Sequence, residues 1–321
     1  MKKFPQMLTC AAALLLSFQA AAWTNKPVKM LVPAPAGGTM DIVARILADQ
    51  LSADIGQPVV VDNKPGAGGA IAIQAMTSAP QDGQTIMVTA SNVLTEIPHV
   101  MKTNFDPLKD IKPVATVASA SMVLVGAPNL PAKNVKELIA YAKTKPGTLS
   151  FASYSAGTSS HYAGMILNQK AGLDLQHVPF PGSPPALAQV MGGQIPIMFD
   201  GMATSLPQVK GGKLQIYGVA SKTRSTHLPQ VPTLAEEGLA EIEFGNWIGV
   251  VVSAGVANDT TDKINAAVLK AAESPKVKTR LVGAGFEPNV AMSAAQLQQS
   301  VRAEFDRNAV IVKNFKIQLN Q

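Results

Sequence analysis

The sequence predicts an α/β protein of two Rossmann-like lobes joined by a two-strand hinge. Short apolar strands alternate with helices through Gly-rich turns, which is the pattern of a parallel sheet. The order strand, loop, helix, strand occurs twice, once around Gly37 and once around Gly157. Two extended apolar runs, residues 121–125 and 246–252, are expected to cross between the two units. A hinge of two strands is typical of a protein that closes around a ligand.

Composition supports two folded domains and excludes several functions. The 321 residues suffice for two domains of about 150 residues each, and with 47% hydrophobic and 15% charged residues the chain is not disordered. The net charge of +6 comes from scattered basic residues, so we expect no nucleic-acid partner. Cys10 is the single cysteine and the four histidines lack metal-ligand spacing. We therefore expect no disulfide, metal or other cofactor.

The N-terminus has the features of a secretory signal peptide over residues 1–22. Two lysines precede an apolar stretch at residues 7–18, and three alanines at 20–22 form a small-residue cleavage site before Trp23. Cleavage at Cys10, as in a lipoprotein, would leave too short an apolar stretch. We expect an exported, periplasmic protein that begins near Trp23.

The first lobe is expected over residues 23–122 and 251–321. Its opening strand, residues 28–32, runs into a Pro- and Gly-rich turn. Apolar runs and helical periodicity predict the other elements: strands at 59–61 and 85–89, and helices at 41–51, 73–77, 260–272, 275–284 and 294–315.

The second lobe is expected over residues 123–250. It begins with a helix at 135–143 that Lys145-Pro146-Gly147 ends. Strands are predicted at 149–152, 177–180 and 195–199, and a helix at 160–171. The 22 residues from Gly37 to Val59 and the 20 from Gly157 to His177 indicate two related units.

Two strand–loop–helix turns are the strongest functional signal. Gly37 and Gly38 let the backbone approach a ligand, and the following helix directs free amides to the same point. Residues 155–160 repeat the arrangement with hydroxyl groups. A helix N-terminus attracts carboxylates, and both loops would lie at the carboxyl ends of strands. Each turn alone is explained by helix capping; the pair favours a ligand with two carboxylates.

A periplasmic serine ester or amide hydrolase is the alternative. Residues 153–157 resemble a nucleophile elbow, with Ser155 as nucleophile and Asp200 with His227 or His177 as its partners. Asp200 has a second interpretation, as a receptor for a ligand amine. His161 is equally explained as a ligand donor and as a half-buried helix residue. The sequence does not match the Gly-rich motif of dinucleotide-binding proteins, because Ile71 occupies the position of the third glycine of that motif.

Taken together, motifs along the whole chain resemble the Bug-type periplasmic solute-binding proteins of tripartite tricarboxylate transporters. The marks of the resemblance are Pro35-Ala36-Gly37-Gly38, Asp41-Ile42-Val43-Ala44-Arg45, Pro65-Gly66-Ala67-Gly68-Gly69, Lys145-Pro146-Gly147, Ser159-Ser160-His161, His177-Val178-Pro179-Phe180, Gly192-Gly193-Gln194 and Leu228-Pro229-Gln230-Val231-Pro232-Thr233. The resemblance implies a Venus-flytrap fold without enzymatic activity. It also implies a monomer that captures a small organic acid, most often a dicarboxylate, and delivers it to a membrane permease.

The resemblance also implies ligand-binding positions. They are Ala36, Gly37, Gly38, Ser91, Ser155, Gly157, Thr158, Ser159, His161, Phe180 and Asp200. The chain departs from the family pattern at Thr39 and Met40, where Gly or Ser and then Thr are usual. Met40 is larger and apolar, which predicts a ligand with an aliphatic or aromatic body. Phe180 replaces a common Tyr and removes a hydroxyl donor.

Overall fold

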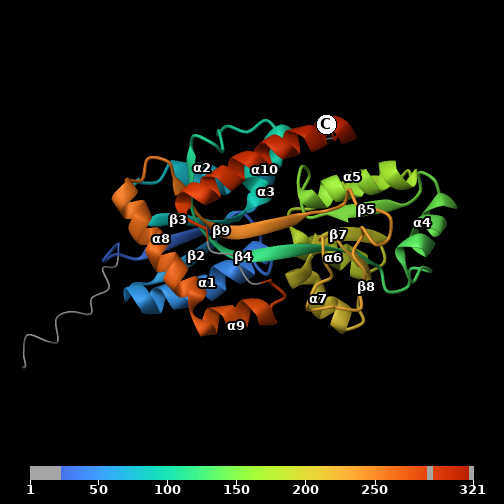
Figure 1. Ribbon diagram of the computed structural model, residues 1–321, viewed down its shortest axis with the longest axis horizontal. Coiled ribbons are helices and arrows are strands. Elements are labelled where there is room, and N and C mark those ends of the chain that lie inside the picture. The colour runs from blue at the N-terminus through green and yellow to red at the C-terminus, as the bar shows by residue number, and fades with distance from the viewer. Residues whose placement is uncertain (1–22, 288–291, 318–321) are drawn as a thin grey trace, which may run out of the picture.

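The computed structural model describes residues 23–287 and 292–317 (Figure 1). The expected signal peptide therefore lies outside the described residues. The strands are β1 (Val28–Val32), β2 (Val59–Asn63), β3 (Thr85–Ala90), β4 (Ile111–Gly126), β5 (Ser150–Ser153), β6 (Gln176–Pro179), β7 (Ile197–Gly201), β8 (Gln215–Val219) and β9 (Gly245–Ser253). The helices are α1 (Thr39–Ile55), α2 (Ala70–Thr77), α3 (Ser91–Thr95), α4 (Val135–Lys143), α5 (Ser159–Ala171), α6 (Ser183–Met191), α7 (Met202–Lys210), α8 (Asn258–Glu273), α9 (Pro275–Gly283) and α10 (Ala294–Phe315).

The strands form a nine-stranded sheet whose two halves share β4. Residues 111–121 of β4 pair with β9, and residues 122–126 pair with β7 on one edge and largely with β8 on the other. The first half has the order β2-β1-β3-β9-β4, and the second has the order β6-β5-β7-β4-β8. We call the half that contains β1 the first lobe and the half that contains β5 the second lobe (Figure 1).

Both lobes use the same strand pattern. In the first lobe β1 pairs in parallel with β2 and β3, and in the second lobe β5 pairs in parallel with β6 and β7. Antiparallel strands complete each half, because β4 and β9 run back between the lobes. The prediction of a two-lobed α/β fold is confirmed.

Helices cover both faces of each half-sheet. In the first lobe α1, α8 and α9 pack on one face, while α2, α3 and α10 cover the other (Figure 1). In the second lobe α4 and α5 share a core, and α6 and α7 cover the opposite face. The cores are mostly aliphatic, as the low aromatic content of the sequence predicts, and most of the buried aromatic side chains lie in the second lobe, around α4 and α5.

Helix α10 contacts both lobes. Leu297 and Val301 are buried in the first lobe, whereas Phe315 and the following Ile317 pack in the core of the second. Near its middle, Asn308 Nδ2 donates a 3.0 Å hydrogen bond to the Thr95 carbonyl in the first lobe. The helix therefore crosses the junction between the lobes along its upper side in Figure 1.

The structure differs from the sequence expectations in several elements. Helix α1 begins at Thr39, two residues before the expected start, so Thr39 and Met40 are helical. Helices α3, α6 and α7 and strand β8 were not predicted. Helix α6 opens with Ser183 followed by two prolines, which are tolerated in a first helical turn, and α7 contains Pro207 in its interior. Among the described helices, none combines the length and apolar character that a membrane crossing requires.

Candidate functional site

A cavity of about 340 Å³ lies between the lobes. Its walls come from the start of α1, the turn at residues 66–69, α3, the junction in β4, and the loops at 154–158 and 179–183. Its described lining residues include no charged side chain. Of the expected binding residues, six line it: Gly38, Thr39, Met40, Ser155, Thr158 and Phe180. Ligand pockets are commonly of this size, largely apolar and provided with few polar groups.

At the α1 end, three backbone amides have no partner among the described residues, those of Thr39, Met40 and Asp41. The preceding residue, Gly38, has no side chain to cap the helix, and no side chain of the described residues caps it either. The amides of Thr39 and Met40 belong to the first turn and have no carbonyl partner within the helix. They start a 17-residue helix, whose N-terminus carries a partial positive charge.

The Asp41 carboxylate is hydrogen-bonded to residues around this turn and does not line the pocket. Its carboxylate accepts hydrogen bonds from the Gly37 amide (2.8 Å), Arg45 Nε (2.9 Å) and Asn63 Nδ2 (2.9 Å). Burial opposes ionisation of Asp41, but the hydrogen bonds from Arg45, Gly37 and Asn63 outweigh it and lower the pKa. The expected pairing of Asp41 with Arg45 is confirmed. Ala36 and Gly37 are exposed and lie outside the pocket lining.

At the α5 end, the helix start is held by a carboxyl group of the other lobe. Ser159 Oγ donates to both oxygens of Glu96, at 2.6 and 2.8 Å, and the Ser159 amide also hydrogen-bonds this carboxyl. Asn246 Nδ2 donates to Ser159 Oγ, and Ser91 Oγ donates to Asn246 Oδ1. Ser91 and Ser159 are thus joined in a buried network that connects the lobes behind the pocket.

Burial raises the pKa of Glu96 to about 8, although hydrogen bonds from Ser159 favour its ionised form. Glu304 adds to the upward shift of this pKa and Arg307 opposes it. At neutral pH the Glu96 carboxyl is therefore mostly protonated.

The other expected residues lie outside the pocket lining. His161 Nδ1 accepts a hydrogen bond from the Gly157 amide (3.2 Å), and its ring stacks on His177 with centroids 3.9 Å apart. Burial lowers the pKa of His161 to about 4 and, with the neighbouring His161, that of His177 to about 3. Asp200 is fully buried and accepts hydrogen bonds from Thr204 and Ser205.

The residues of the hydrolase alternative are not assembled into a triad in the described part of the chain. Ser155 Oγ donates to the Ala156 carbonyl at 3.2 Å. His227 Nε2 is bonded to the Phe286 carbonyl, and His177 Nε2 to Ser153 Oγ. The two histidines expected as the base, His177 and His227, are therefore engaged elsewhere, and neither is hydrogen-bonded to Ser155.

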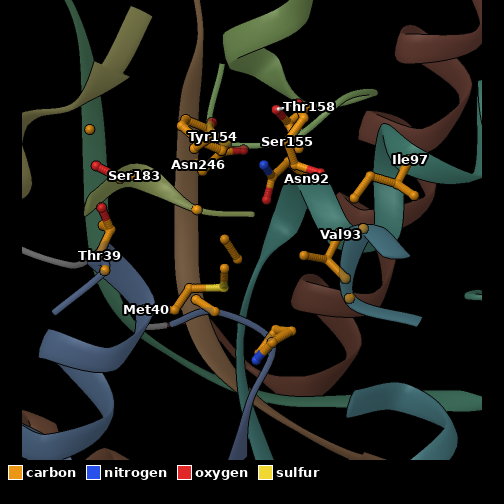
Figure 2. Close-up of a pocket in the computed structure, with 18 of the residues that line it drawn as sticks. Thr39, Met40, Asn92, Val93, Ile97, Tyr154, Ser155, Thr158, Ser183 and Asn246 are labelled. Carbon is orange, nitrogen blue, oxygen red and sulfur yellow. Dashed lines mark hydrogen bonds between the residues drawn. The ribbon is translucent and has the colours of Figure 1, made fainter. Parts of the chain in front are cut away.

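Sequence reasoning missed the pocket residues that α3 and the following turn supply. Asn92, Val93 and Ile97 line the cavity, with Asn92 beside Ser155 and Thr158 and opposite Thr39 and Met40 (Figure 2). Helix α3 follows β3 directly, without Gly or Pro to mark its start. Trp247 is buried in the first-lobe core. Among the described residues, no group of His, Cys, Asp and Glu side chains can hold a metal ion.

The fold and the pocket define a class of protein. Two α/β lobes that are connected by long shared strands and that enclose a small-molecule pocket form a solute-binding protein of the hinged type. Residues 43–317 match the Tripartite tricarboxylate transporter family receptor, and the chain belongs to that family. It is a family of solute-binding receptors, not of enzymes.

Known relatives support the assignment along the whole chain. Protein BugT of Bordetella pertussis is 31% identical over 307 residues, covering 94% of this chain and 93% of BugT. The structure of Rpa4515 of Rhodopseudomonas palustris with adipate has a TM-score of 0.88 at 29% identity and covers 92% of this chain and 99% of that one. MatC of the same organism, with bound malate, has a TM-score of 0.82 at 30% identity, with coverage of 90% and 99%. The resemblance to Bug-type proteins is confirmed.

Proposed function

We propose that this protein captures a small organic acid between its lobes and delivers it to the permease subunits of a tripartite tricarboxylate transporter. The ligand class proposed from the relatives is a dicarboxylate, with an aliphatic or aromatic body. The observation that carries the proposal is the uncapped start of α1, which opens into an apolar pocket between the lobes. An acid carboxylate would take the Thr39 and Met40 amides in a pocket whose lining is largely apolar.

Three further observations support capture of an acid. The described pocket lining has no carboxylate that would repel an anion, because Asp41 and Asp200 are turned to other partners. The adipate and malate in the two similar structures are both dicarboxylates. Met40, Val93 and Ile97 supply apolar surface for the body of the acid.

We also propose that the protein is exported as a monomer to the periplasm with residues 1–22 removed, and that the lobes comprise residues 23–122 with 251–321 and residues 123–250. The partners of β4 change after Ser121, which supports the first boundary. Ile248 and Val250 of β9 pack in the first-lobe core, which favours placing the second boundary nearer to Gly245. N-terminal sequencing of the exported protein and its mass in solution test the export and the monomer.

A screen of carboxylic acids tests the function. Purified protein is titrated calorimetrically with mono-, di- and tricarboxylates of increasing length. We expect at least one acid of this panel to bind with a micromolar or lower Kd and to raise the melting temperature. The absence of binding to every acid of the panel would overturn the proposal.

A further inference from the structure

Two acidic side chains behind the pocket are close enough to interact electrostatically. Glu96 follows α3 and is only 3% exposed, and burial together with the negative charge of Glu304 raises its pKa. Glu304 lies on α10, and burial raises its pKa as well. Glu304 is the less buried of the two, so it gives the pair contact with solvent. Carboxylates are rarely buried unless a positive charge or a proton compensates them.

The positive charge near these carboxyls comes from one side chain. Arg307 lowers the pKa of both Glu96 and Glu304, but among the described residues no ion pair joins it to either carboxyl. The other titratable groups around Glu96 are Tyr154 and Tyr162, and burial raises the pKa of both, so they stay neutral. Two carboxyls beside one guanidinium leave an excess of negative charge, which a bound proton removes.

A chain of hydrogen bonds connects the two carboxyls. Ser159 Oγ donates to the Glu96 carboxyl at 2.6 and 2.8 Å, and Asn246 Nδ2 donates to the same hydroxyl at 3.1 Å. Ser91 Oγ donates to Asn246 Oδ1 at 3.0 Å and also hydrogen-bonds Glu304. Because each group shares a donor or an acceptor with the next, a change in protonation at either carboxyl affects the whole chain.

This chain contacts the pocket. Asn246, in its middle, lines the pocket beside Tyr154, whose hydroxyl hydrogen-bonds Ser159 (Figure 2). Thr158, which also lines the pocket, directly precedes Ser159. An anion in the pocket is therefore separated from Glu96 by one or two residues. The surroundings are largely apolar, so they screen the repulsion between the two charges less than water would.

We propose that capture of an anionic acid is coupled to uptake of a proton, which Glu96 and Glu304 share. A negative charge in the pocket repels an ionised carboxyl in this network and so favours the protonated form. Because such coupling is reciprocal, the proton in turn favours the bound acid. The proton comes from solvent and binds to a carboxylate oxygen of the pair. The inference rests on the proposed function and adds a proton as a second ligand.

Calorimetry in different buffers measures the proton directly. The wild-type protein is titrated at pH 8.5 with adipate and with malate, or with the tightest-binding mono- or dicarboxylate of the panel if neither binds. These acids are fully ionised at this pH, so they exchange no proton themselves. Each titration is run in Tris and in a sulfonate buffer of lower ionisation enthalpy. The difference in binding enthalpy should correspond to uptake of about 0.2 to 1 proton per acid bound.

The affinity should depend on pH in the same sense. Between pH 7.5 and 9 we expect it to fall about three- to tenfold, as the free protein loses the shared proton. Binding enthalpies that are equal in both buffers, with an affinity that does not change with pH, would overturn the proton coupling and leave acid capture intact. Failure of every acid of the panel to bind would overturn the proposed function and this inference together.

Substitutions assign the proton to the pair. Glu96→Gln, which keeps the shape of the side chain, should reduce the uptake at pH 8.5 to less than half. Glu304→Gln removes the like charge that raises the pKa of Glu96, so it should move the uptake to lower pH. Glu237→Gln, outside the pocket and the network, is the matched control and should behave as the wild type. Wild-type uptake at every pH in both Glu96→Gln and Glu304→Gln would overturn the assignment to this pair.

Discussion

Met40 occupies the second position of α1, where its amide and its side chain serve different purposes. The amide belongs to the uncapped first turn, and the side chain lies in the pocket (Figure 2). The thioether also packs against core residues on both faces of the first half-sheet. One residue thus links carboxylate binding to the apolar wall that surrounds the body of the ligand.

Met40→Thr should selectively weaken ligands with a large apolar body. The change removes about two buried non-hydrogen groups from the wall of the pocket. Burial of each contributes about 0.8 kcal/mol to binding, so the affinity for such ligands should fall several-fold to about tenfold. Short acids should bind within about twofold of the wild-type protein. Calorimetry over acids of increasing length measures the difference, and Met191→Thr, a partly buried position outside the pocket, is the control. Equal losses for short and long acids would remove the Met40 side chain from the specificity of the pocket.

At the scale of elements, the start of α5 is completed by a carboxyl group from the turn after α3. Glu96 belongs to the first lobe and Ser159 to the second, so their hydrogen bonds join the two lobes. Tyr162 Oη donates to the Glu96 carbonyl and ties the same helix to the same turn. This junction places α5 and the loop before it at a fixed position in the pocket wall.

The buried carboxyl of Glu96 makes stability depend on pH. Its pKa is raised from 4.5 to about 8, so between these values the folded protein holds a proton that the unfolded chain has released. The free energy of unfolding should therefore fall as the pH rises through this window. Burial lowers the pKa values of His161 and His177, so near pH 6.5 these residues bind protons only in the unfolded chain and oppose the slope; above about pH 7.5 they are mostly neutral in both states and add little to it.

Urea unfolding at several pH values from about 7.5 to 8.5 measures this dependence, because the histidines contribute little there. Glu96→Gln, which mimics the neutral acid, should flatten the decline. Glu237→Gln, which removes a half-exposed carboxylate of the second lobe, should keep the wild-type slope. A Glu96→Gln protein with the same slope as the wild type would show that Glu96 is not the group that titrates.

The elements also show what the sequence can predict. Helix α10 was predicted with its observed bounds, and the structure shows that Ser293 and Gln296 form a capping box at its start. The turn at Gly37 was predicted because the residues that mark it, Gly37 and Gly38, are adjacent in the sequence. The capping of α5 by Glu96 was not, because Glu96 precedes Ser159 by 63 residues and only the fold brings them together. Asn92 was likewise not predicted as a pocket residue, because only the fold brings it beside Ser155 and Thr158.

At the scale of the molecule, the lobes meet at the rim of the pocket. Gly182 of the second lobe, with φ +132°, lies against Pro35 of the first, so closely that an added Cβ would come within 2.3 Å of the proline ring. At another point Gly157 lies against Val100 in the same way, with 2.6 Å from an added Cβ. Both are direct contacts between residues of the two lobes, so the lobes touch at these points in this structure.

Ligand should therefore compact the protein in solution. A ligand that touches both lobes favours the closed state by its differential affinity for the two states. Small-angle scattering is expected to show a smaller radius of gyration with saturating ligand than without it. An unchanged radius, with binding confirmed by calorimetry, would place the ligand within one lobe.

Gly182→Ala should prevent full closure. The added methyl group would overlap the Pro35 ring, so we expect at least a tenfold loss of affinity and little compaction on adding ligand. Gly212→Ala is the matched control, since Gly212 also has a positive φ, of +68°, but no atom within 4 Å of an added Cβ. Similar losses in both variants would assign the effect to backbone strain and not to the contact between the lobes.

Helix α10 connects the two lobes mechanically. Its 22 residues form a rod about 33 Å long. Asn308 and the contact of Phe305 with His99 fasten the rod to the first lobe, while Phe315 and Ile317 are buried in the second. A stiff rod that is attached to both lobes resists a change in the angle between them, so any opening of the hinge must bend α10 or detach one of its ends.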